Sequence, residues 1–158
     1  MIRQGIMNDL EAIALIEALS YPAAEAASYE SIRGRLEAFS ACFWVYEDVD
    51  VLAFINGFTS DEKDLFDEMY HNPSLYNPEG EWLMIFSVAT HPDHRHKGYA
   101  SEVMRQVIKD TRKQGRKGIV LTCKEKLLPF YAQFGYVNEG ISSSDHGGAV
   151  WYQMRLVF

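Results

Sequence analysis

A strand-to-helix junction in the second half of the chain constrains the fold more than any other segment. The apolar, β-branched and aromatic run from Trp82 to Val88 predicts a strand, and His91-Pro92-Asp93 after it indicates a turn. Arg-x-x-Gly-x-Ala follows as Arg95–Ala100, and a helical pattern begins at Gly98. A chain that enters a helix through such a loop points several unpaired backbone N–H groups at one spot, where the helix dipole adds positive potential. The junction therefore predicts a phosphate-binding site.

The charges of the chain are distributed unevenly. Residues 95–126 carry ten Lys or Arg and three Asp or Glu, a balance of +7, whereas residues 60–81 carry seven Asp or Glu and one Lys, a balance of −6. The first segment suits an anionic cofactor and the second a cationic substrate. The net charge of −7 argues against broad nucleic-acid binding.

Length and composition predict one packed domain spanning residues 1–158. Hydrophobic residues make up 47% of the chain and aromatic residues 13%, which is typical of a globular protein. The sequence has no apolar run of membrane-spanning length and no signal-peptide layout at Met1. Its two cysteines, Cys42 and Cys123, lie in strand-like runs, as in reduced intracellular proteins. We therefore expect a cytoplasmic protein with no membrane partner.

The hydrophobic periodicity predicts regular elements along most of the chain. Strands are expected at 2–6, 42–47, 51–58, 81–88, 118–123, 136–141 and 149–157, and helices at 8–19, 28–39, 98–112 and 127–134. This order predicts an α/β (α+β) domain with one mixed, mostly antiparallel sheet of six or seven strands and about four helices. Residues 59–81 interrupt the pattern with one short helical stretch, 63–70, and are expected to form a lid or binding loop.

A second motif follows the strand that ends at Cys123. Residues 127–136 read Leu-Leu-Pro-Phe-Tyr-Ala-Gln-Phe-Gly-Tyr, a short helix closed by glycine and leading into a strand. With both motifs and this element order, nearly the whole chain resembles the GCN5-related N-acetyltransferases. The second motif is most similar to the serotonin (arylalkylamine) branch. The resemblance implies transfer of an acetyl group from acetyl-CoA to a primary amine, with no metal.

The resemblance also implies where the cofactor binds. Pantetheine would pair with backbone groups near Val88 and Thr90, and the pyrophosphate would take the N–H groups of the loop. Backbone N–H groups around Ser87–Ala89 would stabilise the oxyanion. The residues implied in cofactor binding are Val88, Ala89, Thr90, Arg95, His96, Lys97, Gly98, Tyr99, Ala100, Ser101 and Phe130.

Tyr131 is the expected general acid. In the serotonin branch the matching tyrosine protonates the departing thiolate, and a phenol is still protonated and able to donate at neutral pH. The base that deprotonates the amine is open. Met84 and Phe86 stand where the vertebrate serotonin enzymes carry two histidines, and neither side chain accepts a proton. The open alternative is a chain of water molecules that passes the proton to an acidic residue or a histidine. The candidates for that residue are Glu81, His71, Asp67 and Glu68.

The acidic, aromatic segment 60–81 favours a small cationic amine, an arylalkylamine or a polyamine. The residues expected to bind it are Asp67, Glu68, Tyr70 and Glu81. Covalent transfer through Cys123 is disfavoured because the sequence pairs this thiol with no base.

Other functions stay open beside this one. They are protein N-terminal or lysine acetylation by the same machinery, and a non-catalytic acyl-CoA-binding module. The aromatic C-terminal run 150–158 suits pairing with a second copy, so a homodimer is an expectation.

Overall fold

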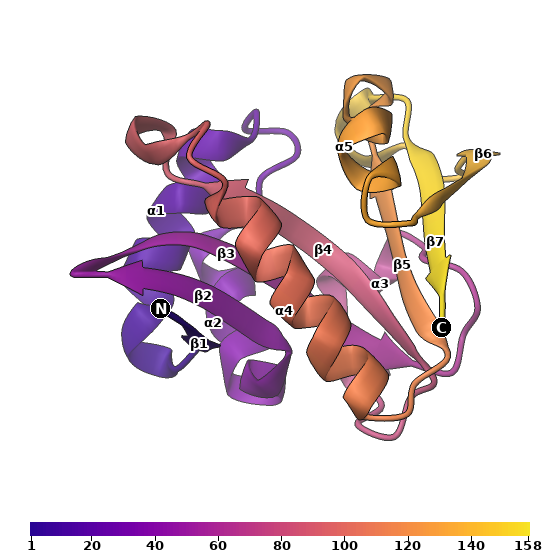
Figure 1. Ribbon diagram of the computed structural model, residues 1–158, viewed down its shortest axis with the longest axis horizontal. Helices are drawn as coiled ribbons and strands as arrows, with labels where there is room; N and C mark the ends of the chain where they lie inside the picture. Colours follow the sequence, from indigo (N-terminus) through magenta and orange to yellow (C-terminus); the bar gives the residue numbers. More distant parts are fainter. The chain divides into compact units, whose positions relative to one another are not determined.

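The computed structural model describes residues 1–158 and contains a seven-stranded mixed sheet with strand order β1-β2-β3-β4-β5-β7-β6 (Figure 1). β4 and β5 are parallel, whereas the β1–β2, β2–β3, β5–β7 and β6–β7 pairs are antiparallel. The expected mixed sheet is therefore confirmed. The strands are β1 (Ile2–Gln4), β2 (Phe43–Asp48), β3 (Asp50–Ser60), β4 (Trp82–Thr90), β5 (Gly118–Cys123), β6 (Val137–Ile141) and β7 (Tyr152–Val157).

Five α-helices accompany the sheet: α1 (Leu10–Ser20), α2 (Tyr29–Phe39), α3 (Glu68–His71), α4 (Tyr99–Lys113) and α5 (Leu128–Ala132). The longest, α4, connects the parallel strands β4 and β5, a connection that always needs a crossover. Its apolar stripe of Val103, Met104 and Val107 is fully buried. None of the helices combines the length and the apolar character that crossing a membrane requires.

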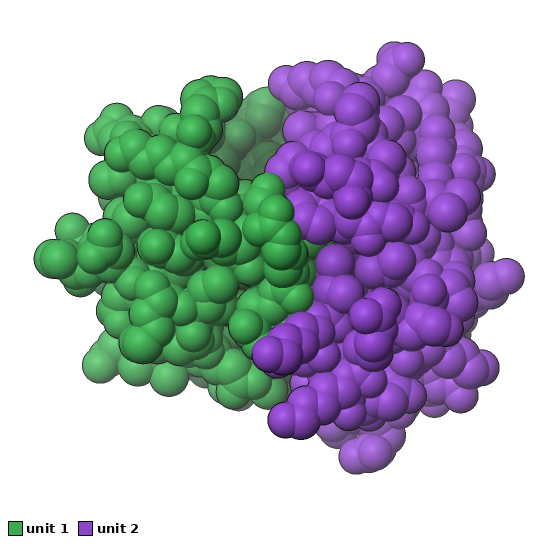
Figure 2. All heavy atoms as spheres, in the orientation of Figure 1, with its two compact units in different colours: residues 1–57, 87–107 green, residues 58–86, 108–158 purple.

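The chain divides into two compact units, which Figure 2 shows in different colours. Unit 1 comprises residues 1–57 and 87–107, and unit 2 comprises residues 58–86 and 108–158. Strands β3 and β4 and helix α4 each begin in one unit and end in the other.

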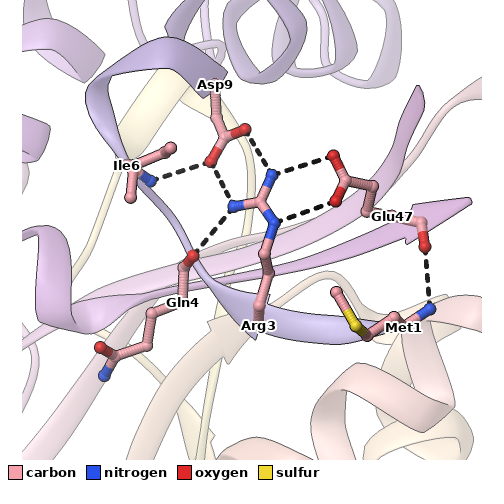
Figure 3. Close-up of polar contacts among 6 residues, drawn as sticks. All are labelled: Met1, Arg3, Gln4, Ile6, Asp9 and Glu47. Atoms are coloured by element: carbon pink, nitrogen blue, oxygen red, sulfur yellow. Dashed lines mark hydrogen bonds and ion pairs between the residues drawn. The ribbon is translucent and has the colours of Figure 1, made fainter. Parts of the chain in front are cut away.

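In unit 1, helices α1 and α2 lie behind strands β2 and β3 in Figure 1, and the first turns of α4 lie in front of them. An ion-pair cluster ties β1 to both α1 and β2 (Figure 3). The Arg3 guanidinium donates to both Asp9 carboxylate oxygens, at 2.9 and 2.8 Å, and to both Glu47 oxygens, each at 3.2 Å. Asp9 also accepts from the Ile6 N–H. The carboxylate that organises the start of α1 is thus Asp9, and α1 begins at Leu10, two residues later than expected.

In unit 2, the expected helix 63–70 is wrong over its first five residues, because that stretch is bound to β7 instead. Buried Arg155 donates to the Lys63 carbonyl at 2.6 Å and to the Asp64 carboxylate at 2.6 Å. The Leu65 N–H donates to the Gln153 side chain at 3.3 Å. The bond to Arg155 takes the Lys63 carbonyl, which a helix would use as an acceptor, and only α3 is helical here.

The hairpin between β6 and β7 also differs from expectation. β7 begins at Tyr152, three residues later than the sequence suggests, because residues 146–148 form a 3-10 turn in which Gly147 and Gly148 have φ angles of 65° and 74°. The turn leaves residues 142–151 as a loop at the end of the β6–β7 pair.

Candidate active site

The loop between β4 and α4 belongs to unit 1 and has the geometry of an anion site. The His91 imidazole accepts from the Asp93 N–H at 3.2 Å, which makes the turn that leaves the strand. His96 and Gly98 then adopt left-handed conformations, with φ of 65° and 83°. These two left-handed residues, with Lys97 between them, turn the chain sharply, and α4 begins directly afterwards at Tyr99. The N–H groups of the first turn of this 15-residue helix lack intrahelical partners and are available to an anion.

Arg95 carries the exposed positive charge at the base of this loop. Its Nε donates to the Thr90 carbonyl at 3.3 Å, and its Nη2 donates to the Ser20 hydroxyl at 3.3 Å. The guanidinium therefore lies where β4 ends, beside the C-terminus of α1. Tyr99 packs its ring on Tyr46 of β2 with centroids 4.4 Å apart, which fixes the first turn of α4 on the sheet. Ala100 and Ser101 continue that turn.

Tyr21 bonds Val88 near the C-terminal end of β4, and no sequence motif identified it. Its hydroxyl donates to the Val88 carbonyl at 2.8 Å and accepts from the Val88 N–H at 3.1 Å. A side chain thus satisfies both backbone groups of a residue within a sheet strand, where a neighbouring strand would ordinarily do so. In this structure the Tyr21 hydroxyl thus occupies both the donor and the acceptor of Val88.

The expected general acid, Tyr131, lies in unit 2 on α5 and is buried, with 6% of its surface exposed. Phe130 packs edge-on against it at 5.0 Å between ring centroids, and Tyr136 lies at 6.0 Å. Burial raises the pKa of Tyr136 far above its usual value, so this second phenol stays protonated. The aromatic neighbours hold the Tyr131 ring in one orientation.

Tyr70, also in unit 2, contacts one residue of β4 and one of β5. The parallel ladder between these strands covers three residue pairs, from Trp82–Gly118 to Met84–Val120. Just beyond it, the Tyr70 ring packs on Phe86 of β4 with centroids 4.9 Å apart, and its hydroxyl lies 3.2 Å from the Thr122 hydroxyl of β5. A side chain from α3 therefore bridges the strands where their ladder has ended.

The loop 142–151 meets α3 through Tyr70 and Asp67. The His146 ring stacks on the Tyr70 ring at 5.2 Å with an interplanar angle of 11°. The Asp67 carboxylate accepts from the Ser144 hydroxyl at 2.5 Å and from the Asp145 N–H at 3.4 Å. Burial opposes ionisation of Asp67, but these hydrogen bonds outweigh it and lower its pKa. Of the expected amine-binding residues, the structure thus brings Asp67 and Tyr70 together around this loop.

Glu81 and Glu68 lie elsewhere in unit 2. Glu81 precedes β4, and its carboxylate pairs with Lys117 at 2.8 Å, next to the first residue pair of the β4–β5 ladder. The cluster around Tyr70 lies beyond the last pair of that ladder, so Glu81 stands apart from it. Glu68 is exposed on α3 and accepts from the Asn72 amide at 3.4 Å.

Cys123 ends β5 as a buried free thiol. Burial raises its pKa to about 11, which keeps the sulfur protonated near neutral pH and disfavours a covalent acyl-cysteine. The chain shows no group of three or more His, Cys, Asp and Glu side chains arranged to hold a metal ion.

The mixed sheet, its parallel central pair and the loop with two left-handed residues between β4 and α4 define a class, the GNAT-fold acyltransferases. The family model described as "Acetyltransferase (GNAT) family" matches residues 7–136, so the chain belongs to this family. It is by class an acetyltransferase. No curated protein matches the sequence significantly.

Several solved structures share the fold at low sequence identity. The loading GNATL domain of CurA from Lyngbya majuscula superposes with a TM-score of 0.84 at 13% identity, covering 99% of this chain and 96% of that domain. The GNAT-like decarboxylase GphF, solved with isobutyryl-CoA, gives 0.85 at 17% identity, with 99% and 98% covered. The protein yncA from Salmonella typhimurium, solved with its cofactor acetyl-CoA, gives 0.71 at 18% identity, with 99% and 92% covered.

Proposed function

We propose that this protein transfers the acetyl group of acetyl-CoA to the primary amine of a small molecule with aromatic or apolar character. The observation that carries the proposal is the β4–α4 segment. There the paired donor and acceptor of Val88 are followed by two left-handed residues and a helix N-terminus. Coenzyme A joins an extended arm that contains amides to a pyrophosphate. The amide needs a backbone donor and acceptor, and the pyrophosphate needs a helix N-terminus, in this order along the chain.

The segment fits coenzyme A residue by residue. The Val88 N–H and carbonyl would pair with a pantetheine amide, flanked by Ala89 and Thr90. The loop N–H groups and the first turn of α4 would hold the pyrophosphate, with charge from Arg95 and Lys97. The remaining loop and helix residues proposed for the cofactor are His96, Gly98, Tyr99, Ala100 and Ser101, and Phe130 is proposed from α5.

Tyr131 would donate a proton to the leaving sulfur. Bound acetyl-CoA supplies an activated thioester, so charge develops on sulfur as the amine attacks. A phenol held at a fixed position beside that sulfur lowers the barrier by donating as the charge forms. The packing of Phe130 on the Tyr131 ring supports such a fixed position. The raised pKa of Cys123 supports direct attack on the thioester over a covalent enzyme intermediate.

The internal contacts of the acidic segment favour an arylalkylamine over a polyamine. Asp64 shares Arg155 with Glu139, and Glu81 pairs with Lys117, so two of the acidic side chains already bind cations of this chain. A polyamine needs several uncompensated carboxylates spaced along its length, whereas an arylalkylamine needs one ion-pairing or proton-accepting group and an aromatic surface. Tyr70 supplies an aromatic ring that packs against both Phe86 and His146.

The proposal is tested by thiol release from acetyl-CoA across a panel of arylalkylamines, polyamines and peptides, comparing wild type with Tyr131→Phe. We expect turnover with arylalkylamines, and a kcat reduced about a hundredfold or more in the variant with CoA affinity kept. Turnover with peptides alone would favour protein N-terminal or lysine acetylation. CoA binding without thiol release from any amine would favour a non-catalytic binding module and contradict the proposal.

A matched pair of variants tests the substrate class. Glu68→Gln removes an exposed carboxylate, whereas Asp64→Asn removes one that is ion-paired with Arg155. If the substrate is an arylalkylamine, both variants should keep the wild-type ranking of amines. The opposite result is a wild type that prefers polyamines and loses this preference in either variant. It would show that the acidic segment selects the substrate by charge.

A further inference from the structure

His91 closes the turn by which the chain leaves β4 in unit 1. Its N–H donates to the Leu52 carbonyl of β3 at 2.8 Å, and its carbonyl accepts from the His94 N–H at 2.9 Å. Its imidazole Nδ1 accepts from the Asp93 N–H at 3.2 Å. Pro92, the first residue of the 3-10 turn that follows, has no N–H to satisfy. His91 therefore binds both N–H groups that this turn presents.

An imidazole differs from the ordinary caps of helical turns because its acceptor depends on pH. Those caps are Ser, Thr, Asp and Asn, whose side-chain oxygens accept hydrogen bonds at any pH near neutrality. The Nδ1 atom of His91 accepts only while the ring is neutral with its proton on Nε2, the tautomer that the bond from the Asp93 N–H requires. A protonated ring carries a hydrogen on both nitrogens, so Nδ1 would then face the Asp93 N–H as a second donor. Protonation of His91 thus removes one of its two bonds to the turn.

The charged side chains next to His91 do not replace that bond. The Asp93 carboxylate lies 3.9 Å from Nδ1, but it is 83% exposed, and an ion pair in that setting contributes little. The His94 ring packs edge-on against the His91 ring with centroids 5.7 Å apart. Arg95 follows, and its guanidinium is held at the Thr90 carbonyl, directly before His91. Arg95, and His94 when it is protonated, repel a positive charge on His91.

The other elements at this turn are β3 and α1. β3 meets His91 through the Leu52 carbonyl, and its acidic residue Asp50 is exposed at the start of the strand. α1 contributes the Ser20 hydroxyl, which accepts from Arg95 at 3.3 Å. Glu17, in the last turn of α1, is buried and accepts from the Ala27 N–H at 2.9 Å. The turn itself contributes two imidazoles, a type of group that changes charge between about pH 5 and 8.

We propose that His91 is a pH-sensitive cap, which holds the β4–α4 loop in its binding conformation when neutral and loosens it when protonated. The inference rests on the proposed function, in which this loop binds the pyrophosphate of coenzyme A. The turn leads directly into Arg95, and the left-handed residues His96 and Gly98 follow. An anion binds their segment best while the loop is already ordered, because ordering a loose loop costs binding free energy. Protonation of His91 should therefore weaken CoA binding.

His91→Asn supplies a cap that does not titrate. Its side-chain carbonyl can accept from the Asp93 N–H, and asparagine is among the preferred capping residues. Isothermal titration at pH 8 and pH 5.5 gives the Kd for CoA of the wild type divided by that of the variant. This ratio should be close to one at pH 8 and about threefold or more higher at pH 5.5. Titration of CoA itself, or of His96, affects both proteins and cancels in the ratio.

His94→Gln is the matched control, because it removes the neighbouring imidazole and keeps the bond from the Asp93 N–H to Nδ1 of His91. Its Kd, divided by that of His91→Asn, should still rise between pH 8 and pH 5.5. The NMR signal of the Asp93 amide gives a readout without CoA. It should move over this range in the wild type and in His94→Gln, and much less in His91→Asn. The Tm of each protein at pH 8 identifies any general loss of fold.

The outcomes separate this inference from the proposed function. A Kd ratio that is the same at pH 8 and pH 5.5 would overturn the role of His91 and leave CoA binding intact. An Asp93 amide signal that moves equally in the wild type and in His91→Asn would do the same. A wild type that binds no CoA at either pH would overturn both the inference and the proposed function.

Discussion

The hydroxyl of Tyr21 bonds both backbone polar groups of Val88, donating to the carbonyl at 2.8 Å and accepting from the N–H at 3.1 Å. The neighbouring residue Ser20 lies 3.5 Å from the Thr90 carbonyl. The segment that joins α1 to α2 therefore occupies the part of β4 that we propose for pantetheine. A ligand amide that pairs with Val88 must displace this phenol.

Tyr21→Phe should raise the affinity for CoA, because the cofactor then displaces no hydroxyl from Val88. Each hydrogen bond is worth about 1 kcal/mol, so a gain of about three- to tenfold is expected. Isothermal titration with CoA measures it. The same change should lower the free energy of unfolding by about 1 kcal/mol. A weaker affinity in Tyr21→Phe would mean that the phenol supports the cofactor instead of competing with it.

Gly98→Ala should weaken CoA binding, because Gly98 has a φ of 83° in the proposed pyrophosphate loop. Gly115 is a matched control, with a φ of 79° and, like Gly98, no atom within 4 Å of an added Cβ. Each alanine should cost about 1–2 kcal/mol of stability through backbone strain alone. Only Gly98→Ala should also raise the Kd for CoA. Equal Kd values in the two variants would contradict the placement of the pyrophosphate.

The Arg3–Asp9–Glu47 cluster should make the stability of unit 1 sensitive to acid. Burial opposes ionisation of Asp9, but hydrogen bonds from Arg3 and Ile6 outweigh it and lower its pKa below the ordinary 3.8. Arg3 likewise lowers the pKa of Glu47 below 4.5. A carboxyl whose pKa is lower in the folded than in the unfolded protein stabilises the fold at pH values above its pKa in the unfolded protein. This stabilisation is lost as the pH falls through the pKa of the carboxyl in the folded protein.

Asp9→Asn should therefore lower the Tm at neutral pH, by about 2–8 °C for a loss of 1–2 kcal/mol. Below about pH 3 the difference from wild type should shrink, because the wild-type carboxyl becomes protonated too. Thermal unfolding by circular dichroism between pH 2.5 and pH 7 measures both effects. A difference in Tm that stays constant across this range would show that Asp9 acts through packing alone.

Cys123→Ala should keep kcat within about twofold of wild type, because a thiol that stays protonated contributes no nucleophile. The pKa of about 11 predicts that iodoacetamide at pH 8 leaves Cys123 of the folded protein unmodified. Intact-mass spectrometry checks the modification. An acetylated Cys123 trapped during turnover would contradict direct attack on the thioester.

The sequence by itself determined the order of strands and helices, the β4–α4 loop and the motif around Tyr131. These features follow from local patterns: alternation within strands, helical spacing in α4, and a glycine where the chain must adopt a positive φ. Each is encoded within about ten neighbouring residues. The fold and the proposed cofactor loop could therefore be predicted before any contact was known.

Only the tertiary structure decided which side chains from distant segments meet. Residues 63–67 follow a helical pattern, but Arg155, 91 residues from Asp64 in sequence, binds them in another conformation. Tyr21 and Val88 are 67 residues apart, and Tyr70 and His146 are 76 apart by their numbers. A hydrogen bond or ring contact between such residues depends on how strands and loops pack, which no local pattern encodes.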